Sequence, residues 1–205
     1  MKCISRRGYT YIVYDKGDGR VFKKEKPLAH QYVLHLSSGH TPRYVHMHKR
    51  QAALLLRVFA GADFLAKPER ISNRSYSQET VTILDEYFAT HSLEENKRAV
   101  DAYIEHIFAT WRHGFSDIIF NCTRNCGVLP DGTVALVDFN EVTFSKDAVA
   151  EKLRETRWGK AFSYTKDLQD GPLKAYYAEV MAKAMTIEHL NQYWKDNAEL
   201  LEKTQ

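Results

Sequence analysis

The chain has 205 residues, of which 44% are hydrophobic, and a formal net charge of +3 at pH 7. This length and apolar content predict a substantial core in one domain or two packed lobes, and they argue against a disordered chain. The mild charge is spread along the sequence and gives no nucleic-acid-binding footprint, and no apolar run approaches the roughly 20 residues that span a bilayer.

The amino terminus and the cysteines favour a cytoplasmic protein. The first residues are basic, but no apolar segment follows them, so they do not form a signal peptide. The three cysteines, Cys3, Cys122 and Cys126, are too few for a disulfide framework and are expected to be free thiols. A zinc site at Cys122 and Cys126 would need two more ligands, for which His113 is the obvious local candidate.

The amino-terminal part is expected to begin with β structure. Strands are predicted over Tyr9–Tyr14 and Arg20–Lys24, which are rich in aromatic and β-branched residues and are joined by a Gly- and Asp-containing loop. A helix is predicted over His46–Ala60, because its apolar residues recur at helical spacing. A second strand pair is predicted over Glu69–Ser75 and Glu79–Tyr87.

Histidines crowd the stretch that leads into the predicted helix: His30, His35, His40, His46 and His48. No carboxylate or cysteine completes a recognisable ligand set, so a polar surface loop is expected there rather than a metal site. His46 and His48 would share a face only in an extended segment.

The carboxyl-terminal part is expected to be mainly helical. Ser92 and Glu95 form a capping-box pattern that opens a helix running to about Arg112. Three more helical stretches are predicted near Asp147–Thr156, Pro172–Met185 and Ile187–Glu202, the last with Thr186 as its cap.

Two residues of metal-binding type bracket a predicted hairpin between these parts. The apolar segments Cys126–Leu129 and Val134–Val137 are joined by a Pro-Asp-Gly turn, so Asn125 before the hairpin and Asp138 after it are predicted to lie close together. Their spacing is 138 − 125 = 13 residues.

This arrangement resembles the catalytic core of the protein-kinase superfamily, in which a catalytic-loop Asn and the Asp of a D-F-G motif bind the magnesium of Mg-ATP. Asp138 and Phe139 match that motif, and Asn140 replaces its Gly. The resemblance implies an α+β fold with two lobes and nucleotide bound between them. A β-rich lobe with one helix would cover residues 1–88, and a mainly helical lobe would cover residues 89–205.

The resemblance also implies roles for residues of the second lobe. Asn125 and Asp138 would hold magnesium, and Asn121 would hold the loop or share that task. The kinase catalytic Asp precedes the Asn by five residues, and 125 − 5 = 120 is Phe120. The nearest acid is Asp117, which would orient the acceptor hydroxyl and accept its proton.

In the first lobe, Lys23 matches the strand lysine that pairs with the α and β phosphates of ATP, with Lys24 open as the alternative. Gln51 stands where a helical Glu usually orients that lysine. The segment that contains Asp85 and Tyr87 resembles the hinge, where backbone groups meet adenine.

Three functions stay open at this point. The chain is expected to be an atypical ATP-dependent kinase with an unknown hydroxyl acceptor. The pair Asn125 and Asp138 favours this function, because a pure scaffold has no chemical need for two magnesium ligands at kinase spacing. A pseudokinase that regulates a partner protein is the alternative, favoured by Phe120 and Gln51. In the third reading the chain is an α+β interaction domain, and its Asp-Phe match is accidental.

Overall fold

The structure is a computed structural model and describes residues 1–5 and 10–196. These residues form an α+β protein that divides into two compact units, Met1–Thr80 and Val81–Gln205. The division falls before the predicted lobe boundary at residue 88. The reason is that the segment after Thr80 pairs with the central hairpin of the second unit, since Thr82 lies opposite Val128 and Ile83 opposite Gly127.

The first unit is built on a five-stranded antiparallel sheet with the strand order β1-β2-β3-β5-β4. Its strands are β1 (Lys2–Ser5), β2 (Tyr11–Asp15), β3 (Arg20–Glu25), β4 (Glu69–Ser72) and β5 (Ser75–Glu79). The two predicted strands before residue 25 are confirmed apart from Tyr9, which lies outside the described residues. The predicted strand Glu69–Ser75 consists of β4 and a turn at residues 73–74. Ser75 begins β5, which pairs antiparallel with both β4 and β3.

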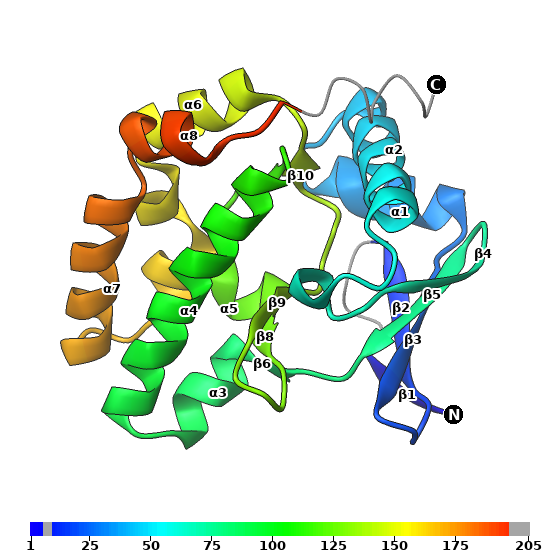
Figure 1. Cartoon of the computed structure of the whole chain (residues 1–205). Helices are drawn as coiled ribbons and strands as arrows, with labels where there is room; N and C mark the ends of the chain where they lie inside the picture. Colours follow the sequence, from blue (N-terminus) through cyan, green and yellow to red (C-terminus); the bar gives the residue numbers. More distant parts are fainter. Residues whose placement is uncertain (6–9, 197–205) are drawn as a thin grey trace. The chain divides into compact units, whose positions relative to one another are not determined.

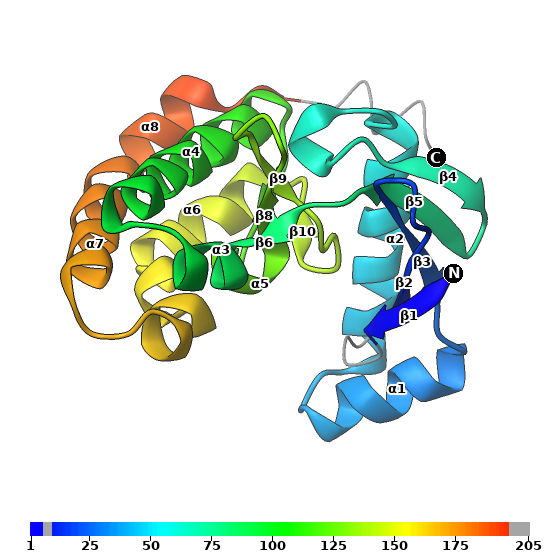
Figure 2. The same cartoon turned by 90° about the horizontal axis from the view of Figure 1, so that it is seen from below.

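Two helices follow β3 in the first unit, α1 (Leu28–Ser37) and α2 (Pro42–Val58), and α1 lies across one end of α2 (Figure 2). The predicted polar loop is therefore wrong. Polar residues occupy core positions of these helices: Gln31 and His35 are buried on α1, and His48 is buried on α2. A pattern based on apolar residues misses such a helix. His46 and His48 are two positions apart on a helix and so do not share a face.

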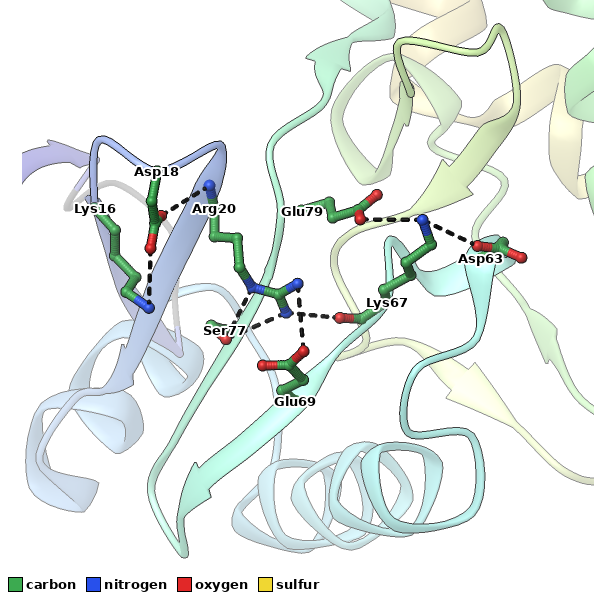
Figure 3. A network of polar contacts seen from close by, with 8 residues as sticks. All are labelled: Lys16, Asp18, Arg20, Asp63, Lys67, Glu69, Ser77 and Glu79. Carbon is green, nitrogen blue, oxygen red and sulfur yellow. Dashed lines mark hydrogen bonds and ion pairs between the residues drawn. The ribbon is translucent and has the colours of Figure 1, made fainter.

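A polar network joins the start of β3 to the segment before β4 (Figure 3). Arg20 donates to the backbone carbonyl of Lys67 at 2.8 Å and to Ser77 Oγ at 3.3 Å, and it pairs with Glu69 at 3.5 Å. Lys67 bridges Glu79 at 3.0 Å and Asp63 at 3.5 Å. The network ties three strands to the short 3-10 turn Asp63–Leu65.

The second unit is mainly helical (Figure 1). Its helices are α3 (Leu84–Thr90), α4 (Leu93–Arg112), α5 (Cys122–Asn125), α6 (Lys146–Arg154), α7 (Pro172–Ala184) and α8 (Ile187–Tyr193), with a 3-10 turn at Arg157–Lys160 and a π-helical turn at Ser163–Asp167. Its short strands are β6 (Thr82–Ile83), β7 (Ser116–Asp117), β8 (Cys126–Val128), β9 (Val134–Leu136) and β10 (Val142–Thr143).

Helix α4 is the centre of this unit, and it packs against α7, α8 and β9. The predicted capping box is confirmed, because Ser92 accepts from the Glu95 amide and Glu95 returns a bond to the Ser92 amide. Trp111 is fully buried near the end of α4 and donates its indole N–H to Ser116 at 3.1 Å. This bond fixes the start of the loop that carries Asp117.

The predicted carboxyl-terminal helices are confirmed as α6, α7 and α8, and Thr186 caps α8 through a bond from the His189 amide. The last predicted helix is shorter than expected, because α8 ends at Tyr193 and Trp194, its C-cap, is extended. Residues 197–202 of that prediction lie outside the described residues. The three cysteines are free thiols, as predicted. Within the described part of the chain, every helix is too short or too polar to cross a bilayer.

Candidate functional site

Two short strands place Asp117 beside the segment that follows the β8–β9 hairpin. β7 pairs with β10 so that Asp117 lies opposite Val142, and the Ile118 amide donates to the Glu141 carbonyl at 3.0 Å. The loop after α4 and the segment around Asp138 therefore run side by side, although they are separated in the sequence by the hairpin.

Asn125 lies between the two acids of the site. Its carbonyl accepts from the amide of Val137 at 2.7 Å and from that of Asp138 at 3.3 Å. Its side-chain Nδ2 donates to Asp117 Oδ2 at 3.3 Å. The predicted proximity of Asn125 and Asp138 is confirmed, and Asp117, the predicted base, lies beside Asn125 in the same cluster.

Asp138 is held by the residue that replaces the motif Gly. Its Oδ1 accepts from the Asn140 backbone amide at 3.2 Å and from Asn140 Nδ2 at 2.6 Å. This local turn is typical of Asp and Asn side chains. Since both bonds go to one oxygen, Asn140 fixes the direction of the carboxylate.

The Asp117 carboxyl has an altered acidity. Burial raises its pKa to about 6 from the ordinary 3.8, and the nearby charge of Asp138 acts in the same direction. Hydrogen bonds from the Ile119 amide, at 2.9 Å, and from Asn125 oppose this rise. A carboxyl with such a pKa exchanges its proton near neutral pH, which is a property of groups that accept protons in catalysis.

Phe120 occupies the place of the kinase catalytic Asp, and its side chain is 1% exposed. Its φ of 55° lies in the left-handed region, which an aromatic residue rarely adopts. The loop is therefore turned so that Phe120 enters the core and its backbone amide contributes a hydrogen bond to Asp117.

The rest of the loop is anchored by contacts that the sequence did not reveal. Asn121 Oδ1 accepts from the Ser163 amide at 3.0 Å and from Ser163 Oγ at 2.7 Å, so Asn121 holds the loop, one of its two predicted tasks. Arg124 binds both carboxylate oxygens of Asp167 at 3.0 Å, and Thr123 donates to the same carboxylate at 2.6 Å.

A hollow of about 610 Å³ lies next to this anchor and was also not predicted. Asp85 and Phe88 of α3, Thr123, and the segment from Asp167 to Leu173 contribute to its lining. Its volume is within the range of small-molecule pockets, roughly 300–1,000 Å³. No single sequence signal marks it, because its walls come from segments that are distant in the chain.

The predicted strand Glu79–Tyr87, on which the hinge assignment of Asp85 and Tyr87 was based, is wrong. Only Thr82–Ile83 of it forms a separate strand, and Asp85 and Tyr87 lie on helix α3. The predicted contact of their backbone groups with adenine stays a prediction. The Tyr87 ring stacks on His91, with centroids 3.7 Å apart. Asp85 is exposed in the first turn of α3, where a carboxylate stabilises the helix.

The predicted residues of the first unit lie on β3 and α2. Lys23 is 8% exposed and its Nζ lies 5.8 Å from the centre of the Tyr76 ring, whereas Lys24 is exposed on the other face of the strand. Gln51 is half-buried on α2, and its buried Oε1 has no hydrogen-bond partner among residues 1–5 and 10–196. The predicted contacts of Lys23 and Gln51 with nucleotide stay predictions.

The donor set of the cluster suits magnesium only in part. Among residues 1–5 and 10–196, no group of three His, Cys, Asp or Glu side chains is arranged to hold a metal ion. Mg²⁺ prefers oxygen ligands and is usually bound by one or two carboxylates together with substrate phosphates. Asn125 and Asp138 fit this second mode, in which the nucleotide supplies the remaining ligands.

Comparison with known proteins leaves the family open. No protein-family model matches the chain, and no curated protein is significantly similar to it.

Proposed function

We propose that the protein is a small kinase-like phosphotransferase that binds Mg-ATP at the cluster of Asp117, Asn125 and Asp138. The observation that supports this most is that the Asn125 carbonyl and side chain bond to the backbone of Asp138 and the carboxylate of Asp117. In protein kinases, an Asn before the hairpin and an Asp after it bind the magnesium ions of Mg-ATP. Asn125 and Asp138 are the candidate magnesium ligands, and the magnesium would neutralise phosphate charge.

Asp117 is the candidate base for the transfer. The acceptor hydroxyl oxygen forms a bond to the γ-phosphorus, the bond to the β-phosphate oxygen breaks, and ADP leaves. Asp117 accepts the hydroxyl proton, and a pKa of about 6 leaves it mostly ionised at pH 7 and therefore able to do so. Because such transfer depends mainly on positioning and charge neutralisation, a base reached by a different loop path from that of kinases is compatible with activity.

A regulatory module without transfer is the second candidate, and Phe120 favours it. Phe120 fills the catalytic position of the kinase loop with a buried ring, so the usual base is replaced by a core contact. In this case the cluster would bind Mg-ATP and the bound protein would act through a partner.

Calorimetric titration with Mg-ATP tests both candidates. We expect Asp138→Asn to weaken binding at least tenfold and Asp131→Asn to leave it unchanged. Asp131→Asn is a matched control, because it removes the same charge from the turn of the same hairpin and Asn-Gly also suits that turn. Equal affinity of all three proteins would overturn the proposal.

ADP formation in the same samples separates the two candidates. Turnover by the wild type that is lost in Asp117→Asn, with Mg-ATP affinity kept, supports the phosphotransferase. Binding without turnover in the wild type, with a range of hydroxyl acceptors, supports the regulatory module.

A further inference from the structure

A basic hollow of about 80 Å³ lies in the first unit, between the β4–β5 hairpin and one face of α2. Helix α2 contributes Lys49, Ala53 and Leu56, which are spaced four and three residues apart and so lie on one face. The hairpin contributes Arg70 and Arg74. The volume is several times the roughly 10–15 Å³ that a single water needs.

The charges around this hollow do not cancel. Lys49, Arg70 and Arg74 bring three positive charges, whereas Glu25 at the end of β3 brings the single carboxylate of the lining. The Glu25 side chain is 8% exposed and is paired with Lys49 and, at 3.6 Å, with Arg74. Gln31 also donates to it at 2.8 Å. The lining is left with a net charge of 3 − 1 = +2.

Arg70 is the remaining cation of the lining, because Lys49 and Arg74 both pair with Glu25. In the described part of the chain it has no ion pair, and its guanidinium donates instead to Asn73 Oδ1 at 2.5 Å and to the Ser72 carbonyl at 3.4 Å. These two contacts orient the guanidinium within the hairpin. Arginine has five donors in a planar fork, so donors remain for a bound oxyanion.

Hydroxyl groups complete a donor set for an oxyanion. Ser72 and Ser75 line the same hollow and bond to each other, with their Oγ atoms 2.7 Å apart. Guanidinium, ammonium and hydroxyl groups together are the donors that proteins use for phosphate. Ala53, Leu56 and the Tyr11 ring form an apolar wall beside these donors, which suits a carbon body attached to the anion.

We propose that this hollow is a phosphate-binding site, separate from the Asp117 cluster, and that it takes the phosphate of a monoester whose carbon body lies on the apolar wall. Arg70 and Arg74 bind the phosphate oxygens, and Lys49 supplies further positive charge. Glu25 limits the affinity, because its carboxylate competes with the ligand for Lys49 and Arg74.

Calorimetry on the full chain at low ionic strength, with inorganic phosphate and with phenyl phosphate, tests the site. We expect saturable binding of phenyl phosphate, at least threefold tighter than that of inorganic phosphate. Equal affinity of the two probes would assign the site to free phosphate and overturn the role of the apolar wall. No saturable binding of either probe would overturn the site.

Variants with opposite expected effects on phenyl phosphate affinity distinguish a change at the site from a general loss of structure. Arg70→Gln is expected to weaken phenyl phosphate binding about tenfold, whereas Glu25→Gln, which keeps the shape of the side chain, is expected to strengthen it. Lys2→Gln removes the same charge from an exposed position on β1 and should leave phenyl phosphate binding unchanged. Equal weakening by Arg70→Gln and Lys2→Gln would show nonspecific attraction and overturn the proposal. Asp138→Asn should leave phenyl phosphate binding intact, which separates this site from the proposed nucleotide site.

Discussion

Asn125 donates its side-chain amide to the carboxylate of Asp117, with 3.3 Å between Nδ2 and Oδ2. The Asn125 carbonyl also accepts from the backbone amides of Val137 and Asp138. One asparagine therefore connects the loop after α4 with the segment after the hairpin. Any change in the charge of Asp117 acts on a residue that also fixes the position of Asp138.

The acidity of Asp117 gives a prediction for stability against pH. Its pKa is raised by burial to about 6, from 3.8, so the unfolded chain loses this proton at lower pH than the folded protein. The ionised carboxyl then destabilises the fold increasingly as pH rises from about 4 to 6, and the cost is constant above that. The shift of about two units corresponds to at most roughly 3 kcal/mol.

Asp117→Asn is therefore expected to be more stable than the wild type at pH 8, by about 1–3 kcal/mol, and nearly equal to it at pH 4. Urea unfolding of both proteins at the two pH values, without metal or nucleotide, measures the difference. An Asn variant that is less stable than the wild type at pH 8 would contradict the assigned direction of the shift.

The stability contributed by Asp167, which anchors the loop through Arg124 and Thr123, should depend on pH in the opposite direction. Burial acts to raise the pKa of Asp167, but hydrogen bonds from Arg124 and Thr123 outweigh it, and the pKa lies below its ordinary value. The stability that this carboxylate contributes is present above the pKa of the unfolded chain and is lost as pH falls through the folded pKa.

Asp167→Asn is expected to cost about 1.5–3 kcal/mol of unfolding free energy at pH 7, the range for hydrogen bonds to charged groups. The difference from the wild type should shrink as the pH approaches 3. Asp170→Asn is a suitable comparison, because Asp170 is exposed and, in the part of the chain that the structure describes, forms a single ion pair, with Lys174 on the surface of α7. Similar losses in both variants would argue against a special role for the Asp167 anchor.

The capping box of α4 supports a third prediction. Ser92→Ala removes the acceptor of the Glu95 amide and is expected to cost about 1 kcal/mol, whereas Ser92→Thr keeps a hydroxyl and should cost much less. Amide exchange in the first turn of α4 would locate the effect. Unchanged exchange in Ser92→Ala would show that packing alone holds this helix end.

Local patterns were sufficient for the elements whose ends carry specific signals. The β8–β9 hairpin follows from its Pro-Asp-Gly turn, and α4 follows from Ser92 and Glu95. Helix α1 was missed because it begins after Pro27 without a side-chain cap and buries Gln31 and His35. Burial of polar side chains depends on partners elsewhere in the fold, such as the Glu25 carboxylate that binds Gln31.

The candidate site also contains contacts that local patterns predict and contacts that join distant parts of the chain. Asn125 and Asp138 were predicted to meet because a tight hairpin joins the segments that carry them, and that geometry is local. The Arg124–Asp167 pair spans 43 residues and the Asn121–Ser163 pair 42, so neither can be read from spacing. Asp117 combines both cases. The sequence predicts it as a site residue, but the β7–β10 pairing that brings it to the cluster cannot be predicted from local patterns.

The close approach of the hairpin to β6 gives the last prediction. Gly127 lies opposite Ile83, and a Cβ atom built at Gly127 would be 2.3 Å from Val81 Cγ2 and 2.8 Å from the Thr82 carbonyl oxygen. These distances are shorter than real Cβ contacts, so Gly127→Ala must displace β6 or the hairpin that ends at Asp138. We expect a loss of about 1–3 kcal/mol, or more because one of the three short contacts is with backbone.

Gly159→Ala provides the matched comparison, because among the described residues its Cβ would meet Thr156 Cγ2 alone, at 3.6 Å, which is an ordinary contact. Urea unfolding should show a small change for Gly159→Ala and a large one for Gly127→Ala. Adding Val81→Ala to Gly127→Ala removes the clash with Val81 Cγ2. It should restore only part of the stability, since the contacts with the Val81 Cβ at 2.9 Å and with the Thr82 carbonyl remain. A Gly127→Ala variant as stable as the wild type would mean that β6 is free to shift away from β8.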